Sequence, residues 1–365
     1  MKFSIMPKNA DFFGLIVLVT FFASSFMCLS VEAERRLDVF WVDVEGGGAT
    51  LMVTPSGESL LFDSGNPGNR DASRIHRMAT EVAGLKQIDY LLTSHFHIDH
   101  YGGAAELAQL MPIKNIVDKG IPEKLIEDRT FHLKIKSYKA IAANRITIKT
   151  GDELALKQQA GLPKLTIRCI AADQVVDTKP ISPDILTSAH APEFIPRKID
   201  PTDNANSINW IVRFGDFAFY HGGDTSWNVE AQIVSPINPH GQVDVYQVNH
   251  HGLDSSNNPI LLQMLSPTVT VMNNGHRKGC GPKTFQTLKD TPSIKAMYQV
   301  RKNLRDDIEN NTADEFIANL NRVSDENVIK LSVASNGLSY SMSIPARNHS
   351  ETYATKQKGF NSRLK

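Results

Sequence analysis

Residues 93 to 103 read Thr-Ser-His-Phe-His-Ile-Asp-His-Tyr-Gly-Gly and follow a short apolar run. This stretch holds four metal-binding side chains: His95, His97, Asp99 and His100. Zinc favours imidazole nitrogens and carboxylate oxygens, and alternate side chains of an extended segment point to the same side. Imidazoles crowded this closely repel one another when protonated and lack polar partners when buried. The stretch therefore predicts a metal site, with Asp99 and His100 available to a second ion.

The spacing His-x-His-x-Asp-His followed by Gly-Gly resembles the signature of the metallo-β-lactamase fold superfamily. Upstream, short strands are predicted at residues 37–44, 49–54 and 59–65, and glycine-rich or Pro-Ser-Gly turns separate them. This order is similar to the opening strands of the superfamily. The resemblance implies that Asp63 lies near the metals, behind the ligands.

Two later strands end in further candidate ligands. Residues 217–224 read as a strand that runs into a glycine turn ending in a carboxylate, so Asp224 is the candidate bridging ligand. Residues 243–252 read as another strand, followed by His250 and His251. The resemblance implies that His250 is the last ligand of the second metal, with His251 close behind it.

Shorter motifs resemble the metallo-β-lactamase domain of DNA-uptake competence proteins. They are Asp-Val-Glu-Gly-Gly-Gly-Ala at 43–49, Asn206-Ser207 before a strand, Gly215-Asp216 between strands, and His250-His251-Gly252 followed by Ser255-Ser256. The resemblance spans roughly residues 37 to 300. In the loop at residues 273–282 the family usually carries histidine, whereas this chain has Cys280, with His276 nearby. This departure weakens the case for a ligand from that loop.

A second departure concerns the superfamily's third motif, which normally supplies a histidine to the first metal. The corresponding residues 201–207 read Pro-Thr-Asp-Asn-Ala-Asn-Ser and contain no histidine. His190 comes earlier and reaches the site if the intervening loop folds back, whereas Asp203 offers an oxygen ligand instead. If neither contributes, the His-x-His pair holds its ion with only Asp224 and water. The sequence leaves these three alternatives open.

The remaining pattern alternates strands with single helices. Helices are predicted around Ile75, Met78 and Val82, at 104–110, 129–144 and 283–289, and further strands at 88–93, 165–171, 208–214 and 217–221. This order suits an α+β fold, a four-layer αβ/βα sandwich with metals at one edge. We expect one domain over residues 34–345 and a polar, disordered tail over residues 346–365.

Composition limits the partners and the cysteine chemistry. Lys plus Arg and Asp plus Glu each number 39, so the formal net charge is zero and gives no support for a nucleic-acid partner. Beyond the N-terminal segment the chain has only Cys169 and Cys280. Two cysteines are too few for a disulfide framework, although one bond between them is compatible with a location outside the cytoplasm.

The ligand set predicts a dinuclear hydrolase with two divalent ions, zinc or alternatively manganese. Paired ions stand about 3.5 to 4 Å apart, generate hydroxide from water near neutral pH and neutralise charge on the substrate. Asp99 and Asp224 are expected to hold this nucleophile, and His251 to donate to a phosphate or oxyanion. The resemblance to the competence-protein domain favours a phosphoester or phosphodiester substrate.

Two other functions remain alternatives. The first is hydrolysis of lactam, lactone or thioester carbonyls on the same fold, which the missing third-motif histidine disfavours because β-lactamases of this type rely on a complete first site. The second is a non-catalytic binding module with structural metal. A structural zinc site needs only four closed ligands, so the additional Asp63, Asp99 and Asp224 argue against this module.

Residues 1–33 have the pattern of a secretory signal peptide. Lysines precede an apolar stretch at residues 12–29, and Val-Glu-Ala at 31–33 offers a small-residue cleavage site. We expect cleavage after Ala33 and a secreted or periplasmic enzyme. The alternative is an uncleaved membrane anchor, because an apolar run of this length borders on what spans a bilayer.

If the segment is a cleaved signal, native protein should begin at or near Glu34 and be recovered outside the cytoplasm. N-terminal sequencing of material from each cell fraction measures this directly. Protein that begins at Met1 in the membrane fraction would favour the anchor, and protein that begins at Met1 in the soluble cytoplasm would contradict export.

Overall fold

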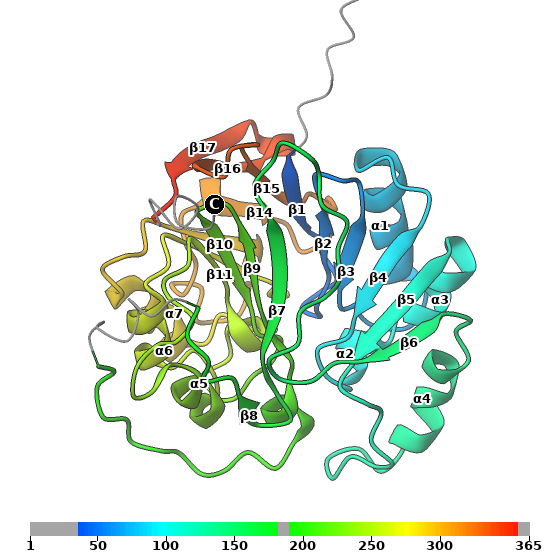
Figure 1. The fold of residues 1–365 in the computed structure, drawn as a ribbon, viewed down its shortest axis with the longest axis horizontal. Helices are drawn as coiled ribbons and strands as arrows, with labels where there is room; N and C mark the ends of the chain where they lie inside the picture. The colour runs from blue at the N-terminus through cyan, green and yellow to red at the C-terminus, as the bar shows by residue number, and fades with distance from the viewer. Residues whose placement is uncertain (1–35, 182–189, 357–365) are drawn as a thin grey trace, which may run out of the picture. The chain divides into compact units, whose positions relative to one another are not determined.

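Two mixed β-sheets form the centre of the fold in the computed structural model, which describes residues 36–181 and 190–356 (Figure 1). The first sheet has the strand order β17-β16-β15-β1-β2-β3-β4-β5-β6, and the second has the order β14-β13-β12-β11-β10-β9-β7-β8. The predicted signal peptide and its cleavage site lie outside the described residues.

The strands of the first sheet come from both ends of the described chain. They are β1 (Leu37–Trp41), β2 (Thr50–Val53), β3 (Ser59–Phe62), β4 (Ile88–Leu92), β5 (Ile113–Asp118), β6 (Asn144–Thr147), β15 (Ile329–Val333), β16 (Ser339–Ile344) and β17 (His349–Ala354). The second sheet is built from β7 (Leu165–Ala172), β8 (Val175–Val176), β9 (Asn209–Phe214), β10 (Phe217–His221), β11 (Val245–Gln247), β12 (Val269–Met272), β13 (Ala296–Arg301) and β14 (Ile317–Asn319).

Helices cover the outer face of each sheet. On the first half lie α1 (Arg70–Arg77), the π-helical η1 (Met78–Val82), α2 (Ile98–Tyr101), α3 (Ala104–Leu110) and α4 (Phe131–Lys139). On the second half lie α5 (Trp227–Val234), α6 (Pro259–Leu265) and α7 (Pro282–Asp290). Short 3-10 turns are η3 (Asp203–Asn206), η4 (Asn249–Gly252), η5 (Asp314–Phe316) and η6 (Pro345–Arg347). In the part of the chain that the structure describes, no helix combines the length and apolar character needed to cross a bilayer.

Three apolar cores separate the four layers. The alternation of side chains along β1 sends Trp41 into the core between the sheets and Phe40 into the core under the helices of the first half. Trp41 meets Phe219 of the second sheet edge to face, with ring centroids 5.8 Å apart. A third core, which includes Ile211 and Leu261, lies between the second sheet and its helices. The predicted αβ/βα sandwich is therefore confirmed.

Parallel strand pairs in both sheets direct loops to one edge of the sandwich. β3 and β4 are parallel neighbours in the first sheet, and β10 and β11 are parallel neighbours in the second. In such sheets, ligand sites form outside the carboxyl ends of the strands. The loops that follow these strands carry the candidate site residues.

Two sequence-based boundaries need correction, and the open question of a bond between the two cysteines is answered. The tail predicted from residue 346 is ordered through Ala354, because β17 extends the first sheet by pairing antiparallel with β16. The helix predicted at 129–144 ends at Lys139, and Asn144 already begins β6. Cys169 and Cys280 are both free and buried, one in the core between the sheets and the other under the helices of the second half.

Candidate metal centre

The loop after β4 carries two histidines toward the site because the residue between them is anchored in the core. Phe96 is buried in an aromatic cluster that includes Tyr101 and Tyr138. Since neighbouring side chains in extended backbone point to opposite sides, burying Phe96 turns His95 and His97 the other way. Their ring centroids lie 4.7 Å apart.

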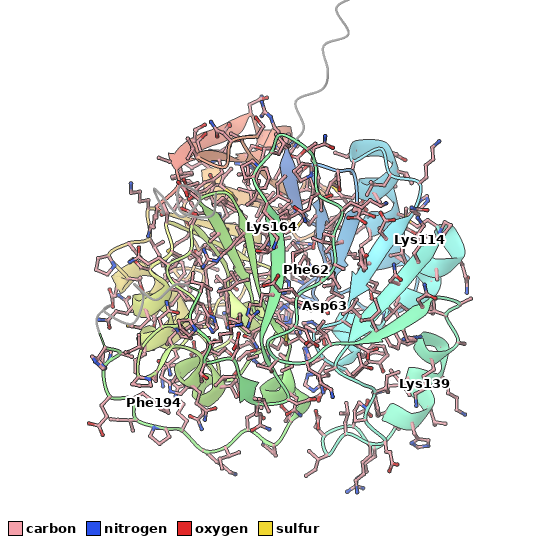
Figure 2. All side chains as sticks on the ribbon, in the orientation of Figure 1. Phe62, Asp63, Lys114, Lys139, Lys164 and Phe194 are labelled. Carbon is pink, nitrogen blue, oxygen red and sulfur yellow. The ribbon has the colours of Figure 1, made fainter. Side chains whose placement is uncertain are left out.

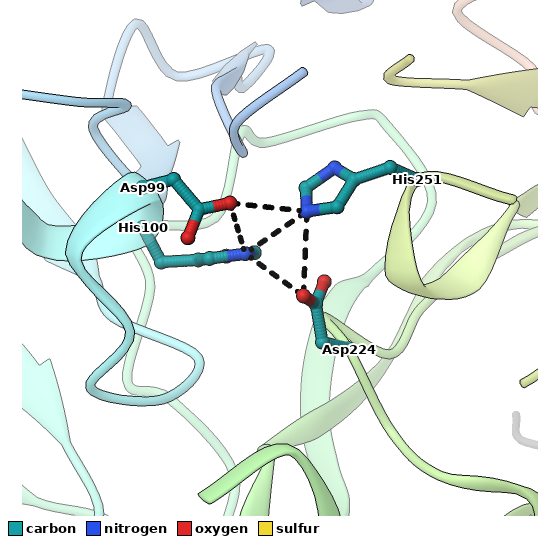
Figure 3. A group of neighbouring side chains, drawn as sticks. All are labelled: Asp99, His100, Asp224 and His251. Atoms are coloured by element: carbon teal, nitrogen blue, oxygen red, sulfur yellow. Dashed lines mark hydrogen bonds and ion pairs between the residues drawn. The ribbon is translucent and has the colours of Figure 1, made fainter. Parts of the chain in front are cut away.

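One group of four side chains combines both halves of the fold (Figure 3). Its members are Asp99, His100, Asp224 and His251. His100 Nε2 lies 3.2 Å from Asp224 Oδ2 and 3.5 Å from Asp99 Oδ2. His251 Nε2 lies 3.3 Å from each of these two oxygens. Two imidazole nitrogens and two carboxylate oxygens that converge in this way form a suitable site for zinc or a similar divalent ion.

A second group shares one member with the first. It consists of His95, His97 and Asp224, and His95 Nε2 lies 3.9 Å from Asp224 Oδ2. His95 is fully buried, and its Nε2 has no hydrogen-bond partner. A buried, unpaired imidazole nitrogen is unfavourable, and a metal ion supplies the missing partner. The two potential ligand groups therefore share the Asp224 carboxylate.

Hydrogen bonds behind the candidate ligands fix their orientation. Asp63 Oδ2 lies 2.8 Å from His100 Nδ1, and Asp63 Oδ1 accepts the backbone N–H of Ser94 at 2.7 Å. Asp63 follows β3 with a positive φ of 60°, near the point where the two halves meet (Figure 2). His251 Nδ1 lies 3.0 Å from the Asn273 carbonyl oxygen. Such partners select the tautomer that leaves Nε2 free for a metal.

A glycine motif allows this close packing. Gly48 belongs to the run at residues 43–49, and its N–H donates to the Asp99 carbonyl oxygen at 3.0 Å. A Cβ at Gly48 would lie 2.9 Å from both Asp63 Oδ2 and His100 Nδ1. Any larger residue here would therefore displace the pair that orients the ligand.

Burial and neighbouring charges set the ionisation of the site. Burial opposes ionisation of Asp224, but His100 and the other adjacent histidines hold its pKa well below the usual range. The same balance holds the pKa of Asp99 well below its usual range. Burial, reinforced by His100, lowers the pKa of His95 well below the ordinary value. Ionised carboxylates and neutral imidazole are the forms that bind metal, so His95 is already in its binding form. Burial opposes protonation of His100, but Asp224 and the other nearby carboxylates outweigh it and hold the pKa of His100 well above its ordinary value, so a metal would displace its proton.

The two substitute ligands proposed for the first metal lie elsewhere. Asp203 Oδ2 accepts the backbone N–H of Phe96, and Asp203 Oδ1 accepts Lys119 Nζ, each at 2.8 Å. His190 is exposed on the surface. Neither residue belongs to a potential ligand group among the described residues. Asp203 therefore braces the metal loop from behind.

The arrangement of the two adjacent histidines differs from the expectation that His250 completes the group of the second metal. His251, not His250, joins the four-residue group. His250 Nε2 lies 3.5 Å from Asp224 Oδ2, while its Nδ1 lies 2.9 Å from Ser255 Oγ. The cause is the backbone, because both histidines have positive φ, 52° and 54°. Strand alternation gives no indication of this turn.

A buried carboxylate supports that turn. Glu230 on α5 accepts hydrogen bonds from Asn249 Nδ2 at 2.7 Å and from the backbone N–H groups of Asn257 and Asn258 at 2.8 and 2.7 Å. Burial raises the pKa of Glu230 to about 7. No motif signals this residue, since it lies within the amphipathic pattern of a helix.

Sequence reasoning also missed two charged neighbours of the ligands. Glu127 Oε1 lies 2.8 Å from His97 Nε2, and Lys278 Nζ pairs with Asp99 Oδ2. Lys278 comes from the loop in which a histidine was sought. In that loop His276 Nδ1 lies 3.3 Å from Glu45 Oε2, at the side of the site. The only sequence signal for the position of Lys278 near the site is the spacing of its loop from the other motifs.

Replacing the carboxylate behind His100 tests this orientation. Asp63→Asn should weaken Zn²⁺ affinity by about 10-fold to 100-fold, because the amide places a donor against His100 Nδ1. A competitive chelator titration measures the affinity, and a circular-dichroism melt checks the fold. Asp290→Asn at the end of α7 is the matched control. Equal affinity in the folded Asp63 variant and the wild type would contradict the orienting role.

Two known proteins are similar in sequence to parts of this chain. The alignment with ComE operon protein 3 of Bacillus subtilis (strain 168) is 22% identical and covers 72% of this chain but 31% of that protein. A metal-dependent hydrolase of Cupriavidus metallidurans is 32% identical over 89 residues, 23% of this chain and 28% of that protein. This chain thus spans less than a third of the length of either relative.

A solved structure and a family model complete the comparison. A diphosphatase of the PhnP family is 10% identical with a TM-score of 0.37, over 71% of this chain and 94% of that one. Residues 43–276 match the model of the metallo-β-lactamase superfamily, a range that includes the metal loop, Asp224 and both adjacent histidines. Because this match covers more than half of the sequence, the chain belongs to the metallo-β-lactamase superfamily.

Proposed function

We propose that this metal-dependent hydrolase of the metallo-β-lactamase superfamily uses two divalent ions, zinc or manganese, to hydrolyse phosphoesters, and phosphodiesters in particular. The observation that carries the proposal is the position of Asp224, which belongs to both ligand groups. A carboxylate shared by two ligand groups suits a pair of adjacent ions. The resemblance to the competence-protein domain supports the phosphoester class.

The second ion would be held by Asp99, His100, Asp224 and His251. The first would be held by His95 and His97 with the same Asp224. We assign its fourth ligand to His250, because its Nε2 faces Asp224 Oδ2 while Ser255 Oγ engages its Nδ1. In this arrangement His250, which precedes the ligand His251, takes the role of the missing third-motif histidine.

Bound as a pair, divalent ions would supply hydroxide near neutral pH and charge neutralisation for the substrate oxygens. The chain's own groups then position the reactants. Asp99 and Asp224, ionised and fixed on opposite halves of the fold, accept hydrogen bonds from the attacking water and orient it. Asp63 keeps His100 in one tautomer throughout.

The proposed location follows from the sequence of residues 1–33, which has the pattern of a cleaved signal. An exported enzyme would meet extracellular or envelope-derived phosphoesters. Buried thiols at Cys169 and Cys280, whose pKa burial raises to about 12, are poorly reactive under such conditions.

Metal removal and a substrate panel test the proposed reaction. Chelation should abolish hydrolysis of bis(4-nitrophenyl) phosphate, and Zn²⁺ or Mn²⁺ should restore it. His100→Ala should lower kcat/KM at least about 100-fold, because the proposed second ion loses a ligand that lies between the Asp99 and Asp224 carboxylates. His132→Ala on the exposed face of α4 is the control. Activity in folded His100→Ala, or faster turnover of a lactam or lactone, would contradict the proposal.

Metal counting tests the ligand assignment separately. Wild-type protein should bind two ions, whereas His250→Ala should retain about one, because the first group then has only three protein ligands. Elemental analysis of dialysed protein gives the ratio. His190→Ala should keep both ions. Two ions in His250→Ala, with one lost from Glu127→Ala or Asp203→Ala, would show that another residue completes the first site.

A further inference from the structure

One cationic side chain contacts the ligand groups. Lys278 Nζ forms an ion pair with Asp99 Oδ2, and among residues 36–181 and 190–356 no other lysine or arginine pairs with a member of either group. The side chain of Lys278 is 38% exposed, whereas that of Asp99 is 17% exposed. The ammonium group therefore lies between solvent and the buried ligands.

The backbone around Lys278 is held in place. Gly275 N–H donates to the Lys278 carbonyl oxygen at 2.9 Å and closes a tight turn. Across from this turn, a Cβ at Gly46 would lie 3.1 Å from Lys278 Cβ, so the two loops pack closely. Arg305 donates to the carbonyl oxygens of Arg277 and Gly279 on either side. These contacts direct the lysine toward the site.

The charge balance at this position changes when the site is loaded. Without a metal, the Lys278 ammonium group has the Asp99 carboxylate as its counter-charge, since the two form a direct ion pair. A divalent ion bound to Asp99 takes up the charge of this carboxylate. The Lys278 ammonium then has no full counter-charge and is available to an anion that enters from solvent.

We propose that Lys278 binds an anionic oxygen of the substrate and makes the enzyme selective for charged phosphodiesters over neutral esters. This inference rests on the proposed function and specifies its substrate class. Lysine acts as a point charge toward phosphate, and a charge-assisted hydrogen bond from it is stronger than one between neutral groups. The residue therefore determines affinity for the anion, while the ligand groups determine the chemistry.

A comparison of an anionic and a neutral substrate tests whether Lys278 binds the substrate's charge. Lys278→Met should raise KM for bis(4-nitrophenyl) phosphate by about 10-fold to 100-fold, with a smaller change in kcat. KM for the neutral diethyl 4-nitrophenyl phosphate should stay the same. Lys278→Arg should restore most of the affinity, since it keeps the charge. Lys283→Met, at an exposed position on α7, is the matched control.

Measurements of phosphate binding and metal content test the role of Lys278 without relying on turnover. Calorimetry with inorganic phosphate and metal-loaded protein should show weaker binding to Lys278→Met, even if no phosphoester is hydrolysed and the proposed reaction fails. Equal phosphate affinity in variant and wild type would overturn the inference. Loss of metal from Lys278→Met, with unchanged phosphate affinity per loaded site, would also overturn it and assign the lysine to positioning Asp99.

Discussion

The position of the Asp224 carboxylate is the constraint on which the site depends. Its Oδ2 lies 3.2 to 3.9 Å from the Nε2 atoms of four histidines, which follow β4 in one sheet and β11 in the other. No single strand or helix can produce that convergence. It requires two sheets packed face to face with their parallel strands ending at the same edge. The core between the sheets, where Trp41 packs against Phe219, fixes their relative position.

Loops that gather so much charge need support from behind, and buried ion pairs supply it. Arg301 is fully buried on β13 and donates to Asp43 Oδ2 at 3.0 Å and Glu45 Oε1 at 2.5 Å, in the glycine-rich segment that underlies the metal loop. Removing one partner of such a network typically costs about 3 to 5 kcal/mol, because the other charge remains buried. Glu230 supports the segment with two consecutive positive φ values in a different way, by accepting hydrogen bonds from Asn249 and Asn257. Structural residues far from the reaction thus determine whether the ligands meet.

The sequence predicted what local pattern and strand ends determine. The metal loop, Asp63, Asp224 and the four-layer sandwich follow from motifs and alternation, and the fold is confirmed. The sequence pointed to His250 as the last ligand of the second metal and could not show that His251 joins the four-residue group, because the backbone of both histidines departs from strand geometry. Nor could it show that Lys119 engages Asp203, since this pairing joins residues that are distant in the sequence. Long-range contacts without a motif leave no periodic trace.

The charged neighbours of the two ligand groups make the site electrostatically asymmetric. Glu127, beside His97, places negative charge next to the first group, and Lys278, beside Asp99, places positive charge next to the second. The backbone N–H of Asp203 donates a hydrogen bond to Glu127 Oε1, which holds this carboxylate beside His97. The proposed substrate, an anionic diester, would be repelled at one end and attracted at the other. Its charged oxygen would therefore lie over the second group, and its leaving group would lie toward the first.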